Sequence, residues 1–142
     1  MTHRTLTDVV AAERDIYEFP WTRGNFRDSL SAGYSCLELR EEGGAALLGY
    51  AVMMFGPEEA HLLNLSILPP VQRRHYGEQL LAVLVGLARS RGARRMFLEV
   101  RPSNHAAQRL YQRAGFHLVG RRRNYYPSRG GREDALLLNL EL

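Results

Sequence analysis

Lysine is absent from this 142-residue sequence, and all 19 of its Lys+Arg residues are arginines. The chain therefore offers no lysine side chain that it or a related protein could modify. Cysteine is almost absent as well. Cys36 stands alone, so no disulfide can form within the chain, and we expect a cytoplasmic protein. Because Cys36 falls in a strand-like stretch, we interpret it as a small buried hydrophobic residue rather than a nucleophile.

Long apolar runs are also missing. No stretch of about eighteen consecutive apolar residues occurs, so nothing in the sequence predicts a membrane-spanning helix. The N-terminal residues 1–8 lack the apolar segment of a signal peptide. We therefore expect no membrane association.

The composition is that of one folded domain, which we place at residues 1–142. The formal net charge of +4 favours an anionic partner, such as a phosphate-bearing cofactor or a ribosomal or nucleic-acid surface, but charge alone does not choose among these. The five histidines are scattered without ligand spacing, so we expect no metal site.

The first part of the chain predicts two helices and a hairpin. Thr7 and Asp8 are suitable N-caps for a first helix, and Thr22 is suitable for a second helix. The pair Gly43-Gly44 predicts a hairpin turn. We expect the first helix to run to about Tyr17, the second to end at Gly33, and the hairpin strands to cover 34–41 and 45–55.

The chain centres on a run that predicts a strand, a turn and a helix. Leu62 to Leu68 is mostly apolar, as in a strand buried on both faces, and Pro69-Pro70 ends it because proline cannot donate to a sheet. A helical pattern follows from Gly77 to about Arg91, and another buried strand covers 95–100. A helix between two such strands predicts a parallel pair with a right-handed crossover.

The remaining pattern predicts one more helix and two strands. The helix begins at residues 102–104 and ends at Ala114, and the strands cover 116–125 and 133–140, joined by a loop rich in Pro, Ser and Gly. The order of all elements predicts an α/β fold, with a mixed central sheet and helices on both faces.

The segment that follows Pro70 has the features of an anion site. It brings Arg73 and Arg74 to the start of a helix, where unpaired backbone N–H groups and the helix dipole favour a phosphate or pyrophosphate. An ordinary connection with solvated arginines is the alternative.

The spacing of Gln72-Arg-Arg-His-Tyr-Gly77 favours the anion site over an ordinary connection. It resembles the pyrophosphate loop of the GNAT acetyltransferases, Gln/Arg-x-x-Gly-x-Gly/Ala, which binds acetyl-coenzyme A. His75 stands where that pattern has its first glycine. Glycine there lets the backbone approach a phosphate or adopt positive φ, so we expect His75 to weaken cofactor binding while the backbone donors remain.

Two side chains outside this loop could carry acid–base chemistry. Glu99 lies near the end of an apolar strand, where burial would raise its pKa and suit a general base. A sheet-edge Glu that reaches water or an arginine is the alternative. Asn104 and Tyr111 share one helix face, and the Tyr111 phenol could protonate a leaving thiolate. A helix cap and a core aromatic are the alternatives for these two residues.

Dispersed matches extend the resemblance over nearly the whole chain. They are Glu13, Phe19-Pro-Trp21, Leu98-Glu-Val-Arg-Pro-Ser-Asn104, Ala107, Leu110-Tyr111, Ala114-Gly-Phe116, Arg123-Asn-Tyr-Tyr-Pro127 and Gly131-Arg-Glu-Asp-Ala135. Together they resemble the RimI-like protein N-alpha-acetyltransferases, a branch of the GNAT superfamily that acetylates the N-terminus of a ribosomal protein in bacteria.

This resemblance implies a GNAT fold and acetyl-CoA as co-substrate, without a metal. It implies that Glu99 is the proton acceptor and Tyr111 the proton donor in a direct attack within a ternary complex. The implied cofactor-binding residues are Leu65, Ser66 and Ile67 for the pantetheine arm and acetyl carbonyl; Arg73, Arg74, His75, Tyr76, Gly77 and Glu78 for the pyrophosphate; and Asn104.

The implied partner is a ribosomal protein N-terminus as substrate. The N-terminal alanine of small-subunit ribosomal protein eighteen is the substrate that we expect before others. Our candidates for holding it are Glu13, Trp21, Tyr125 and Asp134, since rings on loops and acidic groups suit a cationic terminus. Core packing is the alternative for Trp21. We expect a monomer that needs no direct contact with nucleic acid.

Two other functions remain open at the level of sequence. One is a GNAT enzyme for another peptide terminus, a lysine or a small amine. The other is a ribosome-associated binding module with weak cofactor affinity, which His75 and the arginines suggest and which the presence of both Glu99 and Tyr111 disfavours.

Overall fold

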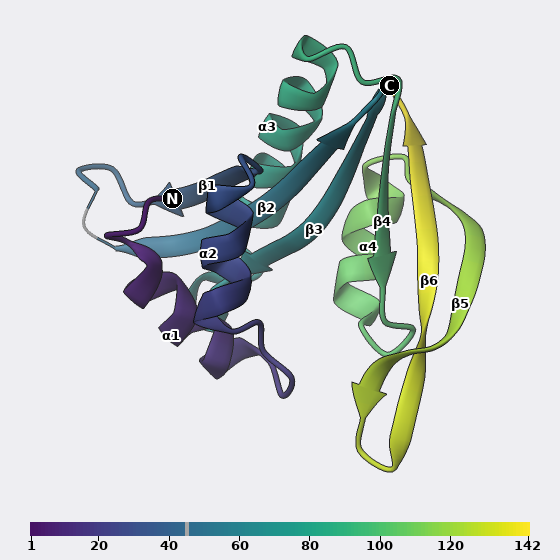
Figure 1. Cartoon of the computed structure of the whole chain (residues 1–142), viewed down its shortest axis with the longest axis horizontal. Helices are drawn as coiled ribbons and strands as arrows, with labels where there is room; N and C mark the ends of the chain where they lie inside the picture. Colours follow the sequence, from purple (N-terminus) through teal and green to yellow (C-terminus); the bar gives the residue numbers. More distant parts are fainter. Residues whose placement is uncertain (45) are drawn as a thin grey trace. The chain divides into compact units, whose positions relative to one another are not determined.

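A computed structural model describes residues 1–44 and 46–142. Within these residues the chain forms four α-helices, one short 3₁₀ helix and six strands (Figure 1). Their order is α1 (Leu6–Ile16), α2 (Arg23–Ser31), β1 (Ser35–Arg40), β2 (Leu47–Gly56), β3 (Glu59–Ile67), η1 (Pro69–Val71), α3 (Tyr76–Ser90), β4 (Arg95–Val100), α4 (His105–Arg113), β5 (His117–Ser128) and β6 (Gly131–Glu141).

The strands form one six-stranded sheet in the order β1-β2-β3-β4-β6-β5. β3 and β4 are parallel, with His61 opposite Phe97, as the helical crossover between them requires. The pairs β1–β2, β4–β6 and β5–β6 are antiparallel. The predicted mixed α/β sheet, including its parallel central pair, is confirmed.

The chain divides into two compact units. The first unit comprises residues 1–54 and 63–84, and the second comprises residues 55–62 and 85–142. In the first unit, α1 and α2 bury their apolar faces against β2, where Val9, Phe26, Tyr50 and Val52 are fully buried. The alternate β2 residues are buried as well, so this strand has an apolar environment on both faces.

In the second unit, β4 alternates between two environments. Met96, Leu98 and Val100 are buried, whereas Phe97 and Glu99 between them are only partly buried. The registers of β6 and β5 continue this alternation, since Glu99 lies opposite Leu137, and Leu137 lies opposite Gly120. We call this partly exposed side of the second unit's sheet the Glu99 face.

Several predicted boundaries are corrected. α1 begins at Leu6 with Thr5 as N-cap, so Thr7 and Asp8 lie inside its first turn rather than at its cap. β3 begins at Glu59, three residues before the predicted start, because a two-residue turn, Pro57-Glu58, suffices to join it to β2. The predicted start of the preceding strand, Ala45, lies outside the described residues.

The C-terminal hairpin is longer than predicted. β5 and β6 continue through the expected Pro/Ser/Gly loop and pair as far as Ser128 and Gly131 (Figure 1). Pro127 is accommodated because β5 is the last strand of the sheet, where a missing N–H donor is tolerated. Asn124 marks an irregularity in β5, with φ of 52°, within a shift of register between Arg122 and Tyr126.

The predicted cap of α2 and the predicted end of α4 are confirmed. Thr22 caps α2 through a reciprocal capping box with Asn25. Gly115, with φ of 101°, follows the C-cap of α4 in the left-handed conformation that ends helices. Cys36 is half-buried in β1, where burial raises the pKa of its thiol. Among the described helices, none is both long and apolar enough to cross a membrane.

Candidate functional site

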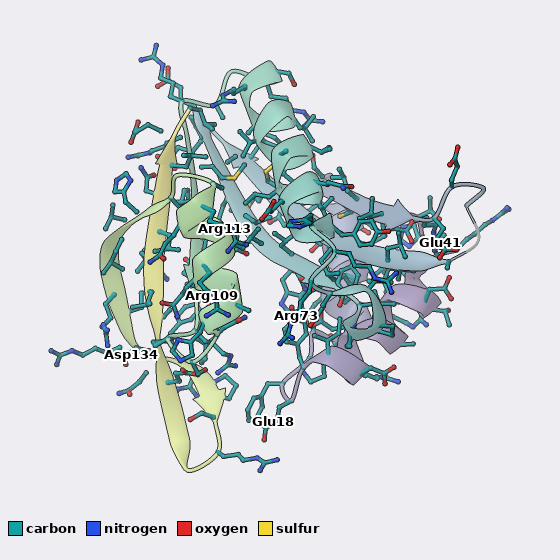
Figure 2. The ribbon with its side chains drawn as sticks, turned by 180° about the vertical axis from the view of Figure 1, so that it is seen from behind. Glu18, Glu41, Arg73, Arg109, Arg113 and Asp134 are labelled. Atoms are coloured by element: carbon teal, nitrogen blue, oxygen red, sulfur yellow. The ribbon has the colours of Figure 1, made fainter. Side chains whose placement is uncertain are left out.

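The loop before α3 has the backbone of an anion site. Its side chain Gln72 donates from Nε2 to the carbonyl oxygen of Ile67 at 2.9 Å, which fastens the loop to the end of β3. Arg73 and His75 both have φ of 65°. Changes of backbone handedness along such a segment turn successive N–H groups to one side, and the first N–H groups of α3 add further donors. Figure 2 shows Arg73 at this end of the first unit.

His75 therefore occupies a left-handed position, which explains why glycine is suitable there. The histidine adopts the required conformation, and its exposed ring approaches Glu78, with Nδ1 3.4 Å from the carboxylate. A left-handed residue other than glycine costs roughly 1–2 kcal/mol. Histidine at position 75 therefore keeps the backbone geometry of the loop, and the left-handed conformation lowers the stability of the fold by this amount.

Exchange of His75 tests this interpretation. We expect His75→Gly to be more stable than His75→Ala by about 1 kcal/mol, because only alanine retains the Cβ atom that disfavours positive φ. Urea unfolding of the two variants measures the difference. Equal stability would show that the left-handed conformation at residue 75 carries no cost.

The β3 segment nearest this loop is fixed by close packing and by a hydrogen-bond chain. A Cβ atom on Gly49 would lie 2.7 Å from the carbonyl oxygen of Ser66, so only glycine permits β2 to approach there. The buried Ser66 hydroxyl donates to Asn64 Oδ1 at 2.7 Å and accepts from the Tyr17 hydroxyl at 2.6 Å. Burial raises the pKa of Tyr17 to about 12, so its hydroxyl keeps its proton.

The same chain ends on Glu13, one of the predicted substrate-binding residues. Glu13 is only 2% exposed, and its carboxylate accepts from Tyr50 Oη, Asn64 Nδ2 and the backbone N–H of Trp21 at 2.9, 2.9 and 3.2 Å. Burial, followed by the charge of Glu13, raises the pKa of Tyr50, which remains a donor. Glu13 therefore supports Asn64 and the Trp21 segment from inside the fold, and its role in substrate binding stays a prediction.

Trp21 lies between the two interpretations offered by the sequence. Its ring packs on Phe26 at a centroid distance of 5.1 Å and is partly buried against the core of the first unit. Phe19, two residues earlier, is 41% exposed. Packing on the core fixes the indole, and contact of Trp21 with a substrate stays a prediction.

In the second unit, Glu99 has a partner that the sequence did not indicate. His61 of β3 places its Nε2 atom 2.6 Å from Glu99 Oε2, and the side chains are 15% and 8% exposed. Arg122 approaches the other oxygen, Oε1, at 3.8 Å. Glu99, His61 and Arg122 thus meet on the Glu99 face, from three different strands.

The environment of Glu99 corrects the predicted direction of its pKa shift. Burial is the largest influence and raises the pKa, as expected. The hydrogen bond and the electrostatic interaction with His61, together with the positive charge of Arg122, outweigh burial, so the pKa of Glu99 lies below its ordinary value. Glu99 is therefore an ionised carboxylate near neutral pH.

Aromatic and charged side chains extend this face toward the end of the hairpin. Tyr126 is partly buried beneath Arg101, whose guanidinium lies 4.4 Å from the ring centroid. Burial and the nearby negative charge of Glu99 raise the pKa of Tyr126. Glu133 accepts from Arg101 at 3.2 Å and from the backbone and side chain of Ser103 at 2.9 and 3.0 Å. This network joins β6 to the loop that precedes α4.

Asp134, the second acidic candidate, supports the irregular part of β5. Its carboxylate accepts from the backbone N–H of Asn124 and from Arg121, both at 3.0 Å, and these bonds lower its pKa (Figure 2). It therefore holds the segment that presents Tyr125, which is 41% exposed and packs edge-on against Tyr126. Of the two tyrosines, Tyr125 is the exposed one and Tyr126 is partly buried.

The two predicted residues on α4 occupy structural positions. Asn104 is the N-cap, and its Oδ1 accepts from the backbone N–H of Ala107 at 3.2 Å. Tyr111 is 7% exposed, with its ring 5.6 Å from that of Phe116 in an edge-on arrangement. Roles in cofactor binding and proton donation stay predictions for these residues.

The predicted site residues fall into two sets. Leu65, Ser66, Ile67, the loop 73–78, Glu13 and Trp21 belong to the first unit, and Glu99, Asn104, Tyr111, Tyr125 and Asp134 belong to the second. Among the described residues, no group of three His, Cys, Asp or Glu side chains is placed to hold a metal ion.

Sequence reasoning missed His61, Arg122 and the Tyr17–Ser66–Asn64 chain. The signal for His61 was weak but present, since a strand prolonged back to Glu59 would have set it beside Phe97 and near Glu99. Arg122 belongs to a run of three arginines, and nothing in that run distinguishes one arginine from the next. No local pattern marks Tyr17, because its partner Ser66 lies 49 residues away.

Comparison with known proteins gives consistent matches over most of the chain. The family model described as "Acetyltransferase (GNAT) family" matches residues 6–116. The [ribosomal protein bS18]-alanine N-acetyltransferase of Escherichia coli strain K12 is 37% identical over 139 residues, covering 96% of this chain and 93% of that protein. A putative enzyme of the same name from Bacillus subtilis is 35% identical over 130 residues, covering 92% and 85%.

A solved structure agrees with these sequence matches. The crystal structure of the ribosomal-protein-S18-alanine N-acetyltransferase from Escherichia coli superposes with a TM-score of 0.90 at 33% identity, covering 99% of this chain and 90% of that one. The Arabidopsis thaliana NAA60 structure, with a bisubstrate analogue, has a TM-score of 0.87 at 18% identity and therefore supports the fold alone.

Proposed function

Because this chain belongs to the acetyltransferase (GNAT) family, we propose that it transfers an acetyl group from acetyl-CoA to the N-terminal α-amine of a protein. The proposed acceptor is the N-terminal alanine of ribosomal protein bS18. The observation that carries this proposal is the 37% identity, over 96% of the chain, to an enzyme named for that reaction. We also propose that residues 1–142 act as one catalytic domain, since the family match crosses both units.

The loop before α3 suits the pyrophosphate of acetyl-CoA. Positive φ at Arg73 and His75 and the N–H groups at the start of α3 give a concave set of donors, and the arginines add positive charge. Arg73, Arg74, His75, Tyr76, Gly77 and Glu78 would hold the pyrophosphate, and Leu65, Ser66 and Ile67 the pantetheine arm and acetyl carbonyl. Asn104 would contact the cofactor from the N-cap of α4.

The proposed chemistry is direct attack by the amine, without an acyl-enzyme. Acetyl-CoA, when bound, supplies the thioester whose carbonyl carbon the amine attacks. Glu99 removes the amine's proton, and Tyr111 gives a proton to the departing sulfur. A protein α-amine has an ordinary pKa near 8, so only a modest base is needed. Cys36 is half-buried with a raised thiol pKa, as suits a residue outside the reaction.

The substrate side of the proposal rests on three aromatic rings, of which Phe19 and Tyr125 are exposed and Trp21 is partly buried. Phe19, Trp21 and Tyr125 are the candidate contacts with the peptide. Glu13 and Asp134 would contribute indirectly, because they hold the segments that carry Trp21 and Tyr125. The proposal requires no nucleic acid and no membrane, and it treats the chain as a cytoplasmic monomer.

Turnover of matched peptides tests the proposed function. We would measure CoA release with an alanine-started bS18 peptide that contains an internal lysine, beside the same peptide with its α-amine blocked. Turnover of the free peptide alone is the expected result. Equal turnover of both would point to lysine acetylation. If neither peptide is turned over although calorimetry shows that acetyl-CoA binds, the proposed acceptor is rejected. If acetyl-CoA does not bind, the result favours a ribosome-associated binding module over an enzyme.

A further inference from the structure

His61 is fixed in place by two neighbours on β4. It lies directly opposite Phe97, and the two rings stack at a centroid distance of 4.3 Å with an angle of 21° between their planes. Glu99, two residues farther along β4, holds Nε2 at 2.6 Å. A ring that is stacked on one side and hydrogen-bonded at one end has a single orientation, as a catalytic imidazole requires.

The pairing determines where the proton of a neutral imidazole lies. Because the ionised Glu99 can only accept, Nε2 carries the hydrogen and donates to it. Nδ1 is then left with a lone pair. Among the residues that the structure describes, none hydrogen-bonds this Nδ1 atom. The arrangement is therefore a histidine oriented by a carboxylate, with its basic nitrogen available.

We propose that His61 is a catalytic residue of the acetyl transfer, that its Nδ1 atom takes the proton of the attacking amine, and that Glu99 is the positioning residue that orients His61. This inference rests on the proposed function and changes one step of it. Glu99 no longer contacts the amine; it acts through the imidazole.

The attacking amine is neutral. A bond forms between the amine nitrogen and the acetyl carbon, while the bond from that carbon to sulfur breaks. His61 Nδ1 receives the proton that the nitrogen loses, and the sulfur receives the proton that Tyr111 gives. His61 later passes its proton to solvent and Tyr111 regains one, so that one amide and one thiol result, with no net change in the protein.

The surroundings of Glu99 favour His61 over Glu99 as the acceptor. One carboxylate oxygen holds His61, and the other faces the guanidinium of Arg122 at 3.8 Å. The hydroxyl of Tyr126, also on this face, keeps its proton and adds no base. A carboxylate that is stabilised in its charged form is a weak base, whereas imidazole changes charge between pH 5 and 8 and suits proton removal near neutral pH.

Two substitutions of His61 test the proposal. Loss of a general base costs between about 100-fold and 10⁴-fold, so we expect His61→Gln and His61→Ala to lower kcat for the alanine-started peptide at least 100-fold. The KM for acetyl-CoA should change little. His3→Gln is the matched control, since His3 is an exposed residue of the first unit, and it should keep full activity. Urea unfolding establishes that each variant is folded.

Rescue by added bases distinguishes a proton acceptor from a structural residue. Imidazole should restore part of the activity of His61→Ala, and a series of imidazoles should rescue more strongly as their basicity rises. If the His61 ring were only structural, rescue would depend on the size of the added imidazole and not on its basicity.

The outcomes separate this inference from the proposed function. An active wild type with a folded His61→Gln variant that keeps more than a third of the activity would overturn the role of His61 and leave the acetyltransferase intact. Rescue that ignores basicity would overturn it as well. A wild type that acetylates no peptide would reject the proposed function, and the role of His61 with it.

Discussion

Glu99→Gln is expected to lower kcat for N-terminal acetylation by about 100-fold or more. Glutamine can still accept a hydrogen bond from His61 Nε2, so the change removes the negative charge with little change of shape. Loss of that charge destabilises the protonated imidazole that forms as the amine attacks. Steady-state assays with the alanine-started peptide measure the effect.

A double substitution identifies how Glu99 acts. If Glu99 acts through His61, Glu99→Gln should lower kcat little further in a protein that already carries His61→Gln. If Glu99 removed the proton itself, the two losses of activity would combine in full. Glu58→Gln is the matched control. It makes the same chemical change at a largely exposed turn position, and this variant should be fully active.

The same variant tests the direction of the Glu99 pKa shift through stability. A carboxyl group whose pKa is lower in the folded chain stabilises the fold above its unfolded pKa, near 4.5 here, and this contribution disappears as the pH falls through the folded value. The difference in unfolding free energy between wild type and Glu99→Gln should therefore be largest near neutral pH and shrink below about pH 4.5. A constant difference would contradict the lowered pKa.

Glu13→Ala is expected to have the largest effect on stability, about 3 kcal/mol or more. The substitution leaves Tyr50 Oη, Asn64 Nδ2 and the Trp21 N–H without their acceptor. Each buried donor without a partner costs about 1–3 kcal/mol. The free energy of unfolding from urea titration, at unchanged m value, measures the loss.

Asp15→Ala is the matched control for this change. Asp15 lies on the same helix, two residues after Glu13, and is exposed, so its replacement should alter stability by no more than about 0.5 kcal/mol. A loss below about 1 kcal/mol for Glu13→Ala would show that water or a rearranged neighbour satisfies the three donors. Any loss of activity beyond that from the unfolded fraction should appear as a raised KM for the peptide, because the Trp21 segment loses its support.

Local signals in the sequence were sufficient for most of the fold. Thr22 caps α2, Gly115 follows α4, and the apolar runs gave β3 and β4 as a parallel pair, because each depends on a few neighbouring residues. They failed where a distant element decides the boundary. The C-terminal hairpin extends through Pro127 since pairing across the sheet outweighs the turn preference of Pro, Ser and Gly.

The candidate site divides in the same way. The anion loop was readable because its donors, its two arginines and the start of α3 are consecutive in sequence. The acidic candidates were not, since Glu13 and Asp134 owe their roles to partners far along the chain or across a hairpin. The chemistry of a carboxylate depends on the groups around it in space, and sequence periodicity does not predict which groups these are.

By itself, the sequence determined the order of elements, the parallel strand pair, the family and the residue types available for chemistry. Only the tertiary structure decided which of these residues meet. It set His61 against Glu99 across 38 residues of sequence and brought Arg122 to the same carboxylate. The physical reason is that hydrogen bonds and charges act over a few ångströms, so the state of Glu99 is fixed by neighbours in space, whereas caps, turns and periodicity act between neighbours in sequence.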